Sequence, residues 1–123
     1  MSGYDSQNIF AKILRGEIPC KEIYRDAFAL AFYDIAPAAP VHALVIPTGE
    51  YRSFDDFVTH ASAQEQLGFF AAVQKVAAML GLQENGYRLI SNHGAHAGQL
   101  VAHFHVHILG GKKLGGLVCQ EKE

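Results

Sequence analysis

Apolar positions along the chain follow two different periods, and each period predicts its own kind of element. Residues 9–14 carry apolar side chains at helical spacing, with Ser6 as a candidate cap and Gly16 as a stop. A longer helical pattern begins with a capping box at residues 62–65 and ends at Gly81. Shorter apolar runs predict five strands, at residues 22–25, 28–33, 42–46, 87–91 and 101–109.

The order of these elements indicates the fold class. The first two strands are separated by only two residues, as in an antiparallel hairpin, and Pro37 and Pro40 take the chain out of the sheet before the third strand. Because the strands come in runs, the sequence predicts an α+β domain whose antiparallel sheet is covered by helices on one face. A chain of 123 residues suits one domain, spanning 1–123 with a C-terminal tail at 112–123.

Composition narrows the range of functions. Half of the residues are apolar and 18% are charged, which is typical of a globular chain. The formal net charge of -2 leaves no basic stripe, so no nucleic-acid partner is expected. No run approaches the roughly 18 apolar residues of a membrane span and no targeting segment is recognisable, so we expect a cytoplasmic protein with no membrane partner. Cys20 and Cys119 lack C-x-x-C spacing and are expected to be reduced thiols.

Histidine is the unusual feature of the composition. Seven are present, and five lie within fifteen consecutive positions, at His93, His96, His103, His105 and His107. Alternate side chains of an extended strand share a face, so the last three rings would line one face while the apolar residues between them face the core. Repulsion between protonated rings opposes such a row, so we interpret it as a functional site that titrates as a unit near neutral pH.

Two chemistries suit this row of histidines. Two alternating rings and a third ligand could bind zinc with one open position, or a neutral imidazole could attack phosphorus while its neighbours bind the phosphoryl oxygens. The upstream loop favours an anion, because Gly94 and Gly98 let backbone N–H groups approach it closely. Asn92 and Gln99 add side-chain donors without charge. No carboxylate occurs in residues 85–120, which removes the usual local partner of a metal-bound histidine.

A specific motif lies within this row. Residues 103–109 read His-Phe-His-Val-His-Ile-Leu and match the His-φ-His-φ-His-φ-φ motif, in which φ is apolar, of the histidine triad superfamily. The chain resembles the Hint branch of that superfamily, the nucleoside phosphoramidases. The resemblance implies the HIT-like fold, in which a five-stranded antiparallel sheet carries one long and one short helix, and two subunits pair into a ten-stranded sheet. The other matching segments are residues 9–10, 16–19, 31–35, 39–42, 45–47, 86–88 and 110–111.

The same resemblance implies an activity: hydrolysis of the P–N bond of purine nucleoside 5′-phosphoramidates, such as AMP-NH2 or AMP-lysine, through a nucleotidyl-histidine intermediate. His105 would be the nucleophile, and His107 would hydrogen-bond the phosphoryl group or the leaving amine. His103 and His42 would support the nucleophile, and Asp34 would accept both ribose hydroxyls. No metal or other cofactor is implied. The remaining nucleotide-binding positions would be Asn92, Gly98 and Gln99 along the phosphate, and Ile9, Phe10, Ile13, Phe32, Ile35 and Leu44 around the purine.

Three features depart from the family pattern. Leu100 stands where some members carry a serine that donates to the phosphate, which bears on the rate. His93 and His96 are extra histidines in the loop, which could bind an anion, bind metal or face water. The tail at 112–123 lacks the tryptophan of some relatives, which bears on the leaving group and the natural substrate. Two alternatives to a phosphoramidase therefore stay open: a nucleotide-binding regulatory module with little turnover, and a zinc-dependent hydrolase.

Overall fold

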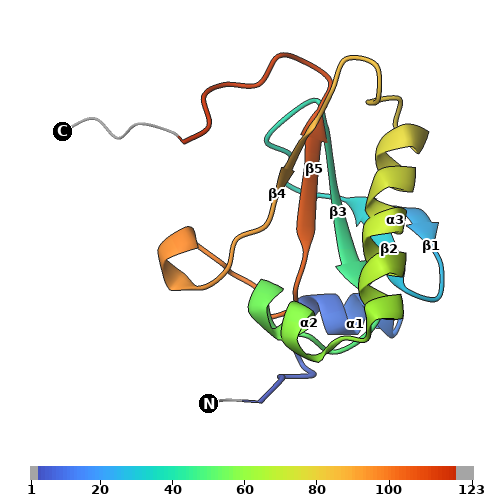
Figure 1. The fold of residues 1–123 in the computed structure, drawn as a ribbon, viewed down its shortest axis with the longest axis vertical. Helices are drawn as coiled ribbons and strands as arrows, with labels where there is room; N and C mark the ends of the chain where they lie inside the picture. The colour runs from blue at the N-terminus through green and yellow to red at the C-terminus, as the bar shows by residue number, and fades with distance from the viewer. Residues whose placement is uncertain (1–2, 119–123) are drawn as a thin grey trace.

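One five-stranded sheet forms the centre of the computed structural model, which describes residues 3–118 (Figure 1). The strand order is β1-β2-β3-β5-β4, and every neighbouring pair is antiparallel. The predicted α+β class and five-stranded antiparallel sheet are therefore confirmed. The last strand of the chain is an inner strand, which places its side chains in the middle of the sheet. The bounds are β1 Glu22–Arg25, β2 Ala29–Tyr33, β3 Val41–Pro47, β4 Arg88–Ile90 and β5 Val106–Gly110.

The long helix α3 (Ala63–Met79) and the short helix α1 (Ile9–Leu14) are the two predicted helices. The capping box of α3 is present, because the Ser62 side chain accepts from the Glu65 N–H and the Glu65 side chain accepts from the Ser62 N–H. In α1 the cap is Asn8, whose side chain accepts from the backbone N–H of Ala11 at 2.9 Å. The predicted cap at Ser6 was wrong.

A second short helix, α2 (Phe54–His60), was not predicted. It begins after Ser53, whose side chain accepts from the Asp56 N–H at 3.4 Å. The Ser-x-x-Asp spacing and the apolar positions that follow it form the sequence signal that could have found this helix. A single 3-10 turn, η1 (Ala95–Ala97), lies in the loop between β4 and β5.

Helices cover both faces of the sheet, because its inner strands are apolar at successive positions. Ala43 and Val45 of β3 belong to the cluster that packs against α2 and α3. Leu44 and Ile46 point to the opposite face, where they pack with Phe10 of α1. The expectation of helices on one face therefore holds for α2 and α3 but not for α1. A continuous apolar strand must be covered on both sides.

The strand that carries the histidine motif is shorter than predicted. β5 begins at Val106, so residues 101–105 lie outside the ladder. The register places Pro47 of β3 opposite this segment, and a proline has no N–H with which to extend the pairing. The Phe104 N–H instead donates to the carbonyl of Tyr51 at 2.7 Å. The alternation of apolar and histidine side chains nevertheless continues through the segment.

The chain after β5 returns to the edge strand β4. The Arg88 guanidinium donates to the carbonyls of Gly115 and Gly116 at 3.0 and 3.4 Å. The predicted tail, 112–123, falls within the described residues only as far as 118, and Cys119 lies outside them. Among the helices of residues 3–118, none combines the length and apolar character needed to cross a bilayer.

Gly68 lets the Phe28 ring lie directly against α3, since a Cβ at Gly68 would lie 2.4 Å from Cδ2 of Phe28. Gly68→Ala should therefore destabilise the protein, even though alanine favours the helix by about 1 kcal/mol. We expect urea titration to give a free energy of unfolding lower by about 1–3 kcal/mol. The Phe28→Leu/Gly68→Ala double variant should recover part of this loss. A Gly68→Ala protein as stable as the wild type would contradict the contact.

Candidate active site

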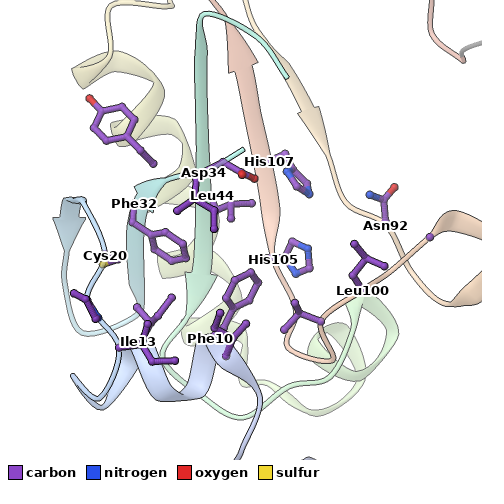
Figure 2. A pocket seen from close by; sticks show the side chains of 17 residues that line it. Phe10, Ile13, Cys20, Phe32, Asp34, Leu44, Asn92, Leu100, His105 and His107 are labelled. Carbon is purple, nitrogen blue, oxygen red and sulfur yellow. The ribbon is translucent and has the colours of Figure 1, made fainter. Parts of the chain in front are cut away.

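A cavity of about 480 Å³ opens between α1, the sheet and the loop before β5 (Figure 2). Apolar side chains of α1, β2 and β3 form one side, and two imidazoles, a carboxylate and an amide form the polar remainder. His42, His103 and Gln99 lie outside the lining. The predicted positions that line the cavity are Ile9, Phe10, Ile13, Phe32, Asp34, Ile35, Leu44, Asn92, Gly98, His105 and His107.

His105 borders the cavity one residue before β5 and is only 8% exposed. Its Nδ1 lies 2.7 Å from the carbonyl oxygen of His103. A carbonyl only accepts, so Nδ1 carries the proton and Nε2 keeps its lone pair. The Phe10 ring packs edge-on at a centroid distance of 5.0 Å. Burial lowers the pKa of His105 below its usual value, which keeps the ring neutral near pH 7.

His103 lies beneath the cavity wall and is fully buried. Its Nε2 is 2.9 Å from the carbonyl oxygen of Pro47, and its Nδ1 is 2.6 Å from the hydroxyl of Tyr4. Nε2–H therefore donates to the carbonyl, while Nδ1 accepts from the hydroxyl. Burial lowers the pKa of His103 to about 4. The ring is a neutral support whose backbone carbonyl orients His105.

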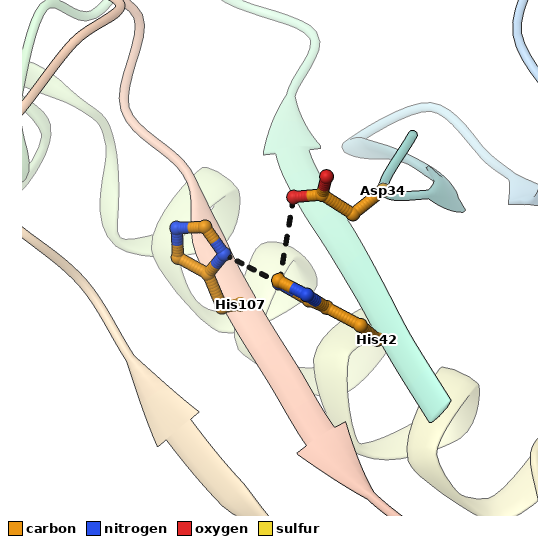
Figure 3. A group of neighbouring side chains, drawn as sticks. All are labelled: Asp34, His42 and His107. Atoms are coloured by element: carbon orange, nitrogen blue, oxygen red, sulfur yellow. Dashed lines mark hydrogen bonds and ion pairs between the residues drawn. The ribbon is translucent and has the colours of Figure 1, made fainter. Parts of the chain in front are cut away.

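A second hydrogen-bonded chain orients His107 (Figure 3). The backbone N–H of Ala38 donates to Nδ1 of His42 at 2.9 Å, so the proton of His42 must sit on Nε2. That Nε2 lies 2.9 Å from Nδ1 of His107 and 3.4 Å from Oδ2 of Asp34. Nδ1 of His107 therefore accepts, and its Nε2 carries the proton. The two rings that border the cavity thus hold opposite tautomers.

The pKa values of His103 and His107 lie well below neutral pH in the free protein, contrary to the prediction that the row of histidines titrates as a unit near neutral pH. Burial and the neighbouring His105 and His42 lower the pKa of His107 to about 4. The carboxylate of Asp34 acts in the opposite direction on His107, but its effect is the smaller one. Desolvation of closely packed rings outweighs their attraction to the single carboxylate. The resting site therefore consists of neutral imidazoles.

Asp34, His42 and His107 are also close enough to be considered as metal ligands, since one ligand atom from each lies within 4.8 Å of the others. The hydrogen bonds oppose this use. The His42 atom that faces the other two groups is Nε2, which carries the proton. Moving that proton to Nδ1 would set it against the N–H of Ala38. These three side chains are therefore arranged as a hydrogen-bonded chain that fixes the ring tautomers, and this arrangement does not suit a zinc site.

The loop before β5 is held by hydrogen bonds within itself. The N–H groups of Gly94, Gly98 and Gln99 donate to the Gln99 Oε1, the Ala95 carbonyl and the Gly94 carbonyl, respectively. Both amide hydrogens of Gln99 are also used, by the carbonyls of Arg52 and Val101. Each of these groups therefore already has a partner within the protein, and binding of phosphate by Gly98 and Gln99 stays a prediction. Asn92, with its side chain at the cavity, is the remaining polar group.

The two extra histidines of the loop lie away from the cavity lining. His93 is 3.7 Å from Asp55 of α2, and His96 is exposed. Leu100 does line the cavity, and its side chain is 95% exposed at the opening. An apolar group therefore stands at the cavity opening, at the position where some members of the superfamily carry a serine.

Sequence reasoning missed Tyr4 and the carbonyl of Pro47, which hold His103, and the N–H of Ala38, which fixes His42. Tyr4 precedes the first periodic segment and is 99 residues from His103 along the chain. No local pattern could reveal that contact. The two prolines after β2 did predict that the chain leaves the sheet there. They did not predict that the N–H of Ala38 in this segment donates to His42.

Comparisons with known proteins agree with this geometry. Residues 15–114 match the HIT domain family, and the chain belongs to that family. It is 50% identical over 117 residues to an uncharacterised 13.2 kDa HIT-like protein of Azospirillum brasilense, covering 95% of this chain and 96% of the relative. It is 41% identical over 116 residues to the purine nucleoside phosphoramidase of Escherichia coli K12, covering 94% and 96%. A HIT family hydrolase structure from Clostridium thermocellum superposes with a TM-score of 0.84 at 41% identity, covering 92% and 97%.

The neutral, buried His103 should make stability depend on pH. Histidine has a pKa of 6.5 in the unfolded chain and about 4 at this position in the folded protein. Between these values the unfolded chain binds more protons, so the free energy of unfolding falls as pH decreases. His103 alone should lower it by about 2 kcal/mol between pH 7.5 and pH 5.

Urea unfolding at these two pH values, above the range in which most carboxylates titrate, measures this effect. The exposed His96→Ala variant is the matched control and should show the same dependence. A free energy of unfolding that does not change between pH 7.5 and pH 5 would contradict the neutral buried ring.

Proposed function

We propose that this protein hydrolyses the P–N bond of a purine nucleoside 5′-phosphoramidate. The observation that carries the proposal is the pair of opposite tautomers at the polar end of an apolar slot. His105 offers a lone pair at Nε2 and His107 offers a proton at Nε2, with ring centroids 5.2 Å apart. A phosphorus atom held beside them would meet a nucleophile and a hydrogen-bond donor before any proton has to move.

The proposed reaction has two steps. Nε2 of His105 attacks phosphorus as the substrate P–N bond breaks, and the amine leaves with its electron pair and is protonated from solvent. The positive charge of the phosphorylated His105 ring is stabilised by the bond from Nδ1–H to the His103 carbonyl. Water then attacks the same phosphorus and the bond to Nε2 breaks. This step releases the nucleoside monophosphate, restores the neutral ring and returns one proton to solvent. His107 donates to a phosphoryl oxygen or to the leaving nitrogen throughout.

The rest of the cavity supports a nucleoside as the other part of the substrate. Asp34 lies between the apolar slot and His107, where a carboxylate could accept from both hydroxyls of a ribose. One of its oxygens already accepts from the Ala36 N–H at 2.8 Å, which fixes the carboxylate plane. Phe10 and Phe32 meet edge-to-face with ring centroids 5.8 Å apart and form part of the apolar lining, which suits a purine.

The similarity to the Escherichia coli purine nucleoside phosphoramidase supports the same leaving-group chemistry. We infer a role for Gln99 that differs from the phosphate contact implied by the family resemblance. It holds the loop of residues 94–101 and so positions Gly98 against the phosphate without touching it.

Release of AMP from adenosine 5′-phosphoramidate in excess EDTA is the direct test. The wild-type protein should turn over, and His105→Ala should lose at least about 10⁴-fold in kcat, because no other lone pair is in position. His96→Ala removes an exposed histidine of the neighbouring loop and should keep full activity.

The alternatives give different results in the same assay. Activity that is absent in EDTA and returns on zinc addition would contradict the histidine mechanism and favour a metal-dependent hydrolase. Tight AMP binding with no turnover under either condition would favour a nucleotide-binding regulatory module.

We further propose that two subunits pair through β4 into a ten-stranded sheet. β4 is an edge strand whose apolar residue Leu89 is 48% exposed. Its charged residue, Arg88, already donates to the carbonyls of Gly115 and Gly116. The opposite edge, β1, carries the exposed charged residues Glu22 and Arg25, which discourage pairing. The β4 edge is therefore the side of the sheet that a second copy would extend.

Sedimentation velocity tests this pairing. The wild-type protein should sediment as a dimer and Leu89→Glu as a monomer, because a charge would be buried at the shared edge. Arg25→Glu changes charge on the other edge and should remain dimeric. A monomeric wild type, or an unaffected Leu89→Glu variant, would argue against pairing through β4.

A further inference from the structure

The carbonyl group that orients the proposed nucleophile belongs to a segment outside the sheet. The backbone carbonyl of His103 accepts from Nδ1–H of the His105 ring, yet β5 begins only at Val106. Ladder hydrogen bonds therefore do not fix the position of this carbonyl. Two kinds of contact replace them: the bond from the Phe104 N–H to Tyr51, and the two bonds made by the His103 ring. The ring of His103 is thus an anchor for its own backbone.

One of the two ring bonds comes from Tyr4, near the start of the chain. Its hydroxyl lies 2.6 Å from Nδ1 of His103, and the two rings meet edge-on at a centroid distance of 5.6 Å. Nε2–H of His103 already donates to Pro47, so Nδ1 can only accept. Burial raises the pKa of the Tyr4 hydroxyl, which therefore keeps the proton that it donates.

We propose that Tyr4 is a positioning residue for the active site: its hydroxyl donates to Nδ1 of His103, holds this buried ring in place and so fixes the carbonyl that orients His105. The effect on turnover rests on the proposed phosphoramidase function, whereas the effect on the His103 ring does not. Tyr4 lies outside the cavity lining and acts only through His103.

Loss of the hydroxyl leaves a fully buried ring with an unpaired nitrogen. The other tautomer would set the Nε2 lone pair against the Pro47 carbonyl, so it becomes accessible only if the ring or its backbone moves. Either movement shifts the acceptor of the His105 Nδ1–H. The chemical step should slow, while the nucleoside slot, which Tyr4 does not touch, keeps its affinity.

Protonation of His103 also becomes easier without this donor, because a hydrogen bond to the lone pair stabilises the neutral ring. The titratable groups in contact with His103 are Tyr4 and, through its carbonyl, His105. Asp5, Arg15 and Glu50 act on Tyr4 from farther away. The acidic limb of the kcat profile should therefore move to higher pH in Tyr4→Phe.

The test compares Tyr4→Phe with Tyr24→Phe, which removes another tyrosine hydroxyl bond, 2.8 Å to Asp26, away from the cavity. With adenosine 5′-phosphoramidate, Tyr4→Phe should lose roughly 3- to 10-fold in kcat at unchanged KM. Tyr24→Phe should match the wild type in kcat. A His103→Ala protein, where it folds, should show no further loss when Tyr4→Phe is added.

Nitrogen-15 NMR of the imidazole rings gives a readout that needs no turnover. The wild-type His103 spectrum should show protonated Nε2 and unprotonated Nδ1. Tyr4→Phe should move the Nδ1 resonance of His103, because its hydrogen bond is lost, and should change the His105 spectrum as well. Unchanged ring spectra in Tyr4→Phe, or a loss of kcat equal to that of Tyr24→Phe, would overturn the proposal. If the wild type itself releases no AMP, the phosphoramidase assignment fails, and the ring spectra still decide how Tyr4 acts.

Discussion

Backbone groups of fixed polarity decide the state of every imidazole in the site. A carbonyl oxygen can only accept and an amide N–H can only donate, so a ring nitrogen facing one of them has no choice of protonation. His105 faces the carbonyl of His103, His103 faces that of Pro47, and His42 faces the N–H of Ala38. His107 takes its state from His42. Three backbone groups therefore fix the tautomers of all four rings. As a result, the lone pair of His105 Nε2 lies beside the Nε2–H donor of His107 at the cavity.

Burial of these rings makes the arrangement stable as well as specific. A charged imidazole in this environment would lose its hydration, so His103 and His107 stay neutral well below the usual pKa of histidine. The sheet provides the burial on one side, because the residues that alternate with the histidines pack under α3. On the other side Phe10 of α1 closes over His103 and His105. The same two-sided covering that stabilises the sheet also sets the protonation state of the site.

Much of this arrangement could be predicted from the sequence. Periodicity and the capping box gave the strands and the long helix, and strict alternation placed the apolar neighbours of the histidines in the core. The start of β5 could not be predicted, because it depends on Pro47, which meets that segment only in the folded sheet. The contacts of Gln99 could not be predicted for a related reason. An uncharged amide donor suits an anion, but in the folded protein the Gln99 amide forms hydrogen bonds to Gly94, Arg52 and Val101. The extent of the single domain, the cytoplasmic location and the lack of nucleic-acid partners stay predictions.

The self-contained hydrogen bonding of residues 94–99 has a thermodynamic consequence for ligand binding. A loop whose N–H groups are already paired is ordered before any ligand arrives, so its conformational entropy is lost on folding and not on association. Binding then requires little reorganisation of the phosphate end of the cavity. In the proposed reaction such a rigid end would bind substrate and product monophosphate alike. The protein would then discriminate between them through the leaving group, at the opening beside Leu100, and through the rate of product release.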